Sequence, residues 1–197
     1  MMGKVELENG SERLKNWSSG GSASLYLVGA LHVGIFAFAT GQVGAESAPF
    51  LGFWILGCAI ALLMLAMVEL RRGEVLFGTI GMVFGGLLGV GGALSFIRSM
   101  WVAGILPIDG WWFLSAGIIL FLLLPSVRKV SWLMFGGIAE IGITLTILGL
   151  GMMGVFGPPE PPLRLAGWLA LLFAIFCWYE ATAQLVNTVY NKQVLPL

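Results

Sequence analysis

The sequence predicts an all-α integral membrane protein with six transmembrane helices. Of its 197 residues, 58% are hydrophobic and only 10% are charged, whereas a soluble domain carries roughly 25% charged residues. The apolar residues gather in six runs separated by short glycine-, proline- or charge-rich segments. We therefore expect a flexible N-terminal tail at 1–22, a six-helix domain at 23–191 and a C-terminal tail at 192–197, with no room for a separate soluble domain.

The first three spans are expected at residues 24–43, 49–70 and 75–96. Ser24 is a suitable N-cap for the first, and the second ends in an acidic residue, two arginines and Gly73. The third is the most glycine-rich, and Gly81, Gly85 and Gly89 share one face because they are four residues apart. Small residues at this spacing let helices approach closely.

The last three spans are expected at residues 111–124, 130–153 and 163–189. The fourth, which we expect Pro125 to stop, is shorter than the ~20 residues needed to cross a bilayer. We therefore expect this helix to begin earlier or to thin the bilayer locally. The proline-rich segment 157–162 predicts a rigid turn before the sixth span.

The distribution of basic residues predicts that both termini lie in the cytoplasm of a multi-pass plasma-membrane protein. Alternate connections between the spans fall on opposite sides of the membrane. One side carries eight Lys and Arg residues and the other carries two; these are Lys4, Arg13, Lys15, Arg71, Arg72, Arg128, Lys129 and Lys192, against Arg98 and Arg164.

Several function classes are excluded by composition and motifs. The net charge of zero argues against nucleic acid as a partner. The sequence contains one histidine and no metal-ligand motif, catalytic triad, phosphate loop or nucleotide fingerprint. We therefore expect neither an enzyme nor a bound metal or cofactor, and we expect the lipid bilayer and a small solute as partners.

Polar residues inside the apolar runs are the candidate functional residues. Glu180, Gln184 and Asn187 lie at i, i+4 and i+7 and so share one face of the sixth span. Glu140 lies near the middle of the fifth span, and His32 lies in the first. A carboxylate at that depth costs about 2.5 kcal/mol or more unless it is neutral, paired or hydrated. These residues predict a path for a small solute, although buried hydrogen bonds between helices would also explain them.

The sequence also resembles a known transporter family. The pattern Ala166-Gly167-Trp168, Tyr179-x-Ala181, Asn187 and Val194-Leu195-Pro196 occurs at the family's spacing, and Glu69 to Gly73 followed by Phe77, Phe84 and Gly85 is a second match. On these residues the chain resembles a divergent member of the acetate uptake transporters, the bacterial succinate–acetate permeases and their yeast relatives.

The resemblance implies a homo-hexamer in which each six-helix protomer has a central pore for acetate and similar carboxylates. It places the family's hydrophobic constriction on Phe84, on Ala30, and on Ile138 or Ala139. It also places Tyr179 with the polar ladder as a pore-lining residue.

The sequence is compatible with three functions. The first is passive or proton-coupled passage of a small monocarboxylate, in which protonation of Glu140 removes a negative charge that repels the anion. The second is a hexameric channel for neutral solutes such as urea, amides or ammonia, favoured by two intramembrane carboxylates and by the expectation of no basic pore residue. The third is a structural membrane subunit that does not transport.

Overall fold

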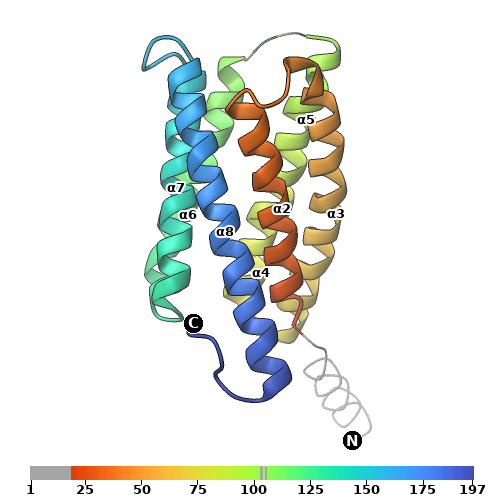
Figure 1. The fold of residues 1–197 in the computed structure, drawn as a ribbon, viewed down its shortest axis with the longest axis vertical. Helices are drawn as coiled ribbons and strands as arrows, with labels where there is room; N and C mark the ends of the chain where they lie inside the picture. The colour runs from red at the N-terminus through yellow and green to blue at the C-terminus, as the bar shows by residue number, and fades with distance from the viewer. Residues whose placement is uncertain (1–18, 103, 105) are drawn as a thin grey trace, which may run out of the picture.

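The protein is an all-α bundle of long helices that run side by side. This computed structural model describes residues 19–102, 104 and 106–197, and within them six helical segments are long and apolar enough to cross a membrane (Figure 1). The helical elements, in chain order, are α2 (Gly21–Ala39), η1 (Ala45–Ser47), α3 (Ala48–Arg72), α4 (Val75–Met82), the π-helical η2 (Val83–Gly91), α5 (Gly92–Ile97), η3 (Arg98–Met100), α6 (Pro107–Arg128), α7 (Trp132–Met152) and α8 (Glu160–Tyr190). The elements α4, η2, α5 and η3 together form the third span. The predicted fold class is therefore confirmed.

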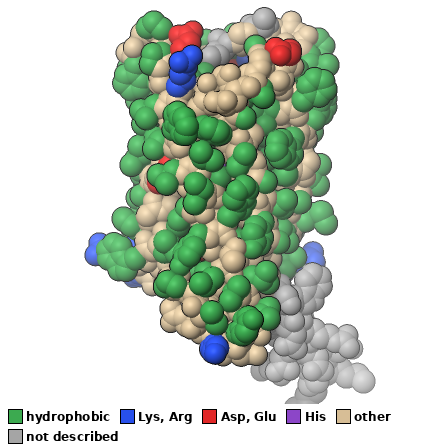
Figure 2. All heavy atoms as spheres, in the orientation of Figure 1, with side chains coloured by type: hydrophobic (Ala, Val, Ile, Leu, Met, Phe, Trp, Pro, Cys, Tyr) green, Lys and Arg blue, Asp and Glu red, His purple; other side chains and the backbone are tan. Residues whose placement is uncertain are grey.

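Figure 2 shows apolar side chains along the side of the bundle, with most of the visible charged side chains near its two ends. Large apolar residues such as Phe50, Met64 and Leu122 are more than 60% exposed. Such a surface is stable against lipid tails and unfavourable in water. The chain is accordingly a multi-pass membrane protein.

Several helix boundaries differ from those expected. The fourth span, α6, has 22 residues from Pro107 to Arg128, so it is long enough to cross without thinning the bilayer. Pro125 lies inside its last turn and does not stop it. Ser24 does not cap α2, which begins at Gly21; its hydroxyl instead donates to the carbonyl of Gly20.

The sixth span is also longer than expected. It begins at Glu160, so two prolines of the predicted turn lie in the first turn of α8, where a missing N–H costs no helical hydrogen bond. Gly73, with φ 87°, ends α3 as predicted. Residues 1–18 of the expected N-terminal tail lie outside the described residues.

Glycines set the close contacts between neighbouring helices. Gly81, Gly85 and Gly89 face α3, and a Cβ at Gly89 would come 2.6 Å from the Cβ of Ala59. On the other side of the bundle, the backbones of α6 and α7 meet at Gly110 and Gly149. The helix α8 packs against both α2 and α7, which closes the bundle around a central space.

Candidate functional site

Three cavities follow one another along the axis of the bundle. The upper cavity, of about 490 Å³, reaches the end at which α5 and α6 are connected, at the top of Figure 1. The middle cavity is much smaller, about 80 Å³, and the lower cavity, about 570 Å³, lies at the end that carries the α6–α7 connection. A volume of about 80 Å³ holds roughly two or three water molecules, or one solute of the size of acetate.

A narrow apolar zone separates the upper cavity from the middle cavity. Val28, Leu62 and Phe84 line both cavities, and we call these three residues the Phe84 constriction. All three are buried, and the ring of Phe84 stacks on the ring of Phe173 with centroids 6.0 Å apart. The ring of His32 also meets Phe173, edge-on, with centroids 4.8 Å apart. Aromatic rings from three spans thus close the space between the cavities.

The local backbone of the third span explains how Phe84 reaches this position. Phe84 is the second residue of the π-helical stretch η2, whose wider turns occur frequently at functional sites. The next residue, Gly85, lies against Leu63 of α3, with only 3.0 Å between a Cβ at that position and Leu63 Cγ. Because the glycine face is held against α3, the neighbouring Phe84 side chain is directed to the bundle centre.

Two carboxylates line the middle cavity. Glu180 is only 4% exposed; Gln184 Nε2 donates to its Oε1 at 3.4 Å, and its buried Oε2 has no hydrogen-bond partner among the described residues. Glu180 and Gln184 also line the lower cavity, so they stand where the two cavities meet. Two members of the predicted polar ladder therefore do face a central cavity.

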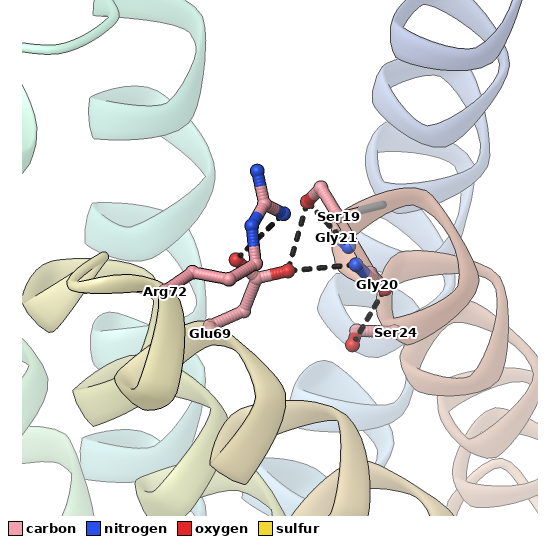
Figure 3. Close-up of polar contacts among 6 residues, drawn as sticks. All are labelled: Ser19, Gly20, Gly21, Ser24, Glu69 and Arg72. Atoms are coloured by element: carbon pink, nitrogen blue, oxygen red, sulfur yellow. Dashed lines mark hydrogen bonds and ion pairs between the residues drawn. The ribbon is translucent and has the colours of Figure 1, made fainter. Parts of the chain in front are cut away.

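The second carboxylate, Glu69, was not singled out from the sequence as a functional residue. Figure 3 shows it between the end of α3 and the start of α2, where its Oε1 accepts from Gly20 N at 2.7 Å and from Ser19 Oγ at 2.8 Å. Its Oε2 pairs with Arg72 at 3.4 Å. The negative charge at the N-terminus of α2 is favourable for the helix dipole. In sequence, Glu69 was indistinguishable from the surface charges that end a span.

Basic residues occur at both ends of the series of cavities. Arg98 lines the upper cavity, where its Nη2 pairs with Asp109 Oδ2 at 2.7 Å, and Asp109 in turn accepts from Leu106 N at the start of α6. Arg128 and Lys129 line the lower cavity, and the Arg128 guanidinium lies 4.6 Å above the Trp132 ring. The expectation of no basic residue along the path is therefore wrong for these cavities, because residues at the ends of the third and fourth spans line them.

Two of the four predicted constriction residues line the cavities and two do not. Phe84 lies in the Phe84 constriction, and Ile138 lines the middle cavity just below it. Ala30 and Ala139 are partly buried and do not belong to the lining of these cavities. His32 lines the upper cavity, and its Nδ1 donates to the carbonyl of Val28 at 2.7 Å.

Glu140 lies beside the path and not in its lining. The hydroxyl of Thr144 donates to Glu140 Oε1 at 2.8 Å, and it is Thr144, one turn further along α7, that lines the upper cavity. The buried Oε2 of Glu140 has no hydrogen-bond partner among the described residues. Glu140, which was singled out by its depth in the span, therefore lies one helical turn away from Thr144, which faces the cavity.

Asn187 and Tyr179 hold the C-terminal segment. Asn187 Nδ2 donates to the carbonyl of Leu195 at 2.8 Å, and its Oδ1 accepts from the backbone N–H groups of Val194 and Leu195. The Tyr179 hydroxyl donates to the carbonyl of Pro196 at 2.8 Å. Neither residue belongs to the lining of the three cavities. The structure gives both an anchoring position, which sequence spacing alone did not indicate.

No group of three or more His, Cys, Asp or Glu side chains within the described part of the chain is placed to hold a metal ion. The cavities are lined mainly by apolar surfaces, together with four carboxylates, the amide of Gln184, and basic side chains at both ends; the carboxylates are those of Glu46, Glu69, Asp109 and Glu180. This set suits binding and passage of a small solute.

Comparison with known proteins supports the fold. No protein-family model and no curated protein matches the sequence. Among solved structures, the chain is similar to the bacterial acetate channel SatP, with a TM-score of 0.82 and 13% sequence identity. The match covers 92% of this chain and 99% of the channel chain. The chain thus has the six-helix fold of that channel over nearly its whole length.

Proposed function

We propose that this protein is a membrane channel or transporter that passes acetate or a similar small monocarboxylate through the centre of each protomer. The observation that carries the proposal is the series of three cavities along the bundle, which share lining residues at the Phe84 constriction and at Glu180 and Gln184. The similarity in fold to a bacterial acetate channel supports the same conclusion.

The Phe84 constriction acts as the gate in this proposal. Apolar rings that close a narrow passage exclude water and make it costly for a hydrated ion to pass. A small solute with a methyl group can contact these rings favourably on its apolar side. Val28, Leu62 and Phe84 then select for solutes that shed water easily and fit the narrow middle cavity.

The carboxylates of the middle cavity point to passage that is linked to protons. Glu69 is compensated by Arg72 and by two further donors, whereas Glu180 receives only the 3.4 Å contact from Gln184 among the described residues. An ionised Glu180 repels a carboxylate anion in the same cavity. The anion therefore crosses together with a proton, carried by the solute or by Glu180.

A second candidate function is a channel for neutral solutes such as urea or small amides. The same two carboxylates, Glu69 and Glu180, favour it, because they line the narrowest cavity and disfavour anions without affecting a neutral molecule. The basic residues that line the upper and lower cavities favour the carboxylate instead.

A flux measurement with purified protein in liposomes separates the two functions. We expect uptake of labelled acetate that exceeds the uptake into protein-free liposomes and increases as the outside pH is lowered at constant inside pH. Uptake of urea that exceeds that of acetate at every pH favours the neutral-solute channel. The absence of protein-dependent flux of either solute contradicts both and leaves the structural-subunit hypothesis.

The proposal also includes cytoplasmic termini and a homo-hexameric assembly. Five Lys and Arg residues among those described lie at the lower end and two at the upper end, which supports cytoplasmic termini in the plasma membrane; they are Arg71, Arg72, Arg128, Lys129 and Lys192, against Arg98 and Arg164. The exposed apolar helix faces leave room for neighbouring protomers, and we retain the homo-hexamer as a proposal that native mass spectrometry tests.

A further inference from the structure

The upper cavity contains a guanidinium group whose hydrogen-bonding capacity is only partly used. Arg98 begins η3 at the end of the third span, and its side chain is 25% exposed. Its Nη2 donates to Asp109 Oδ2 at 2.7 Å and lies 3.4 Å from the carbonyl of Gly104. Its Nε and Nη1 are buried and have no hydrogen-bond partner among the described residues.

This arrangement holds Arg98 at the wall of the upper cavity and leaves two of its nitrogens without an acceptor among the described residues. Asp109 is fixed because the same Oδ2 also accepts from Leu106 N at the start of α6, so the guanidinium is held at one defined place. An arginine offers donors on all three nitrogens, and Asp109 is paired with only one of them. Because Nε and Nη1 are buried, a ligand in the cavity reaches them after a small rotation of the Arg98 side chain. Buried donors without a partner are unfavourable, and a carboxylate is the acceptor whose planar shape and charge match them best.

The surroundings of Arg98 indicate the size and shape of the ligand. The upper cavity continues from Arg98 and Ser99 past apolar residues such as Phe96 and Leu148 to the Phe84 constriction. The other acid of the upper cavity, Glu46, is exposed to solvent, so water screens its charge more than that of Asp109, whose side chain is only 12% exposed. A ligand with a carboxylate at one end and a short aliphatic group at the other fits this polarity.

We propose that Arg98 forms a binding site for the carboxylate of a short aliphatic acid in the upper cavity, with Asp109 as the residue that positions it. This site deepens the proposed function, on which it rests, because it names the group that distinguishes a carboxylate from a neutral molecule of the same shape. Acetamide is that molecule, since an NH2 group takes the place of one carboxylate oxygen of acetate and the molecule carries no charge.

The test measures binding and flux separately on the full-length protein. Binding of acetate and of acetamide is measured by saturation-transfer difference NMR in detergent, which detects weak ligands and needs no transport. Flux of both solutes is measured in liposomes. Arg98→Gln removes the site, and Arg164→Gln is the matched control, because Arg164 is an exposed arginine at the same end and does not line the cavity.

We expect Arg98→Gln to lower the acetate signal and the acetate-to-acetamide flux ratio at least tenfold, while Arg164→Gln changes either by less than twofold. If Arg98→Gln does not yield monodisperse protein, the site is tested with Arg98→Lys. It keeps the positive charge but loses the guanidinium donors, and we expect at least a threefold loss of the acetate signal.

An unchanged acetate signal in the Arg98 variants, or an equal loss for acetate and acetamide, overturns the site. Acetate binding that depends on Arg98 without flux of either solute supports the site and contradicts the proposed transport function. The binding measurement therefore tests the Arg98 site and the flux measurement tests the transport function, so either can fail without the other.

Discussion

Replacement of Glu180 by glutamine tests the electrostatic barrier in the middle cavity. The substitution keeps the shape of the side chain, and the new carbonyl can still accept the 3.4 Å contact from Gln184 Nε2. A cavity of about 80 Å³ has a radius of roughly 3 Å, so an anion within it lies about 6 Å or less from the Glu180 carboxylate that lines it.

The magnitude follows from Coulomb's law. At ~6 Å and an effective dielectric constant of ~20, two negative charges repel each other by about 3 kcal/mol. Removal of the charge on Glu180 therefore raises the occupancy of the cavity by acetate anion up to roughly 100-fold. We expect acetate flux at neutral pH to rise by one to two orders of magnitude, with a weaker dependence on pH than in the wild type.

The assay is uptake of labelled acetate into liposomes, with acetamide as the neutral reference and Glu140→Gln as the matched control. Glu140 is also an acid inside a span with an unpartnered oxygen among the described residues, but it does not line the cavities. We expect Glu140→Gln to raise acetate flux clearly less than Glu180→Gln does, because repulsion falls with distance and Glu140 lies behind Thr144. Equal effects of the two substitutions, or an equal increase for acetate and acetamide with Glu180→Gln, would refute the reasoning.

Three further predictions concern the gate, the helix packing and the C-terminal segment. Phe84→Ala joins the upper and middle cavities, so it raises acetate flux and admits butyrate in the same liposome assay; exclusion of butyrate by this variant would contradict its role as gate. Gly149→Ala places a Cβ 2.7 Å from a backbone carbonyl of α6 and lowers stability by about 1–3 kcal/mol, seen as a lower unfolding temperature in detergent. Gly136→Ala on the same helix meets nothing within 4 Å and leaves that temperature unchanged or higher, and similar melting of the two variants would disprove the close contact. Asn187→Ala removes the hydrogen bonds to the C-terminal segment and speeds hydrogen exchange of the Val194 and Leu195 amides, whereas the exposed Gln193→Ala does not; equal exchange in both would contradict the anchoring.

The candidate site was only partly predictable because depth in a span and direction around a helix are different quantities. The i, i+4 spacing of Glu180 and Gln184 correctly placed them on one face, and that face meets the middle cavity. Glu140 was singled out by its depth, yet the face of α7 that lines the upper cavity carries its partner Thr144. The direction of a face is set by the neighbouring helices, which a single sequence does not reveal.

The sequence by itself determined the six apolar spans, the all-α class and the glycine face of the third span, because hydrophobicity and i, i+4 spacing are local properties of the chain. Only the tertiary structure decided that Glu69 and Arg98, which look like surface charges at the ends of spans, line internal cavities. It also decided that Asn187 holds the C-terminal segment. These placements depend on contacts between segments far apart in the chain; Gly20 and Glu69, for example, are 49 positions apart. No local pattern encodes such contacts.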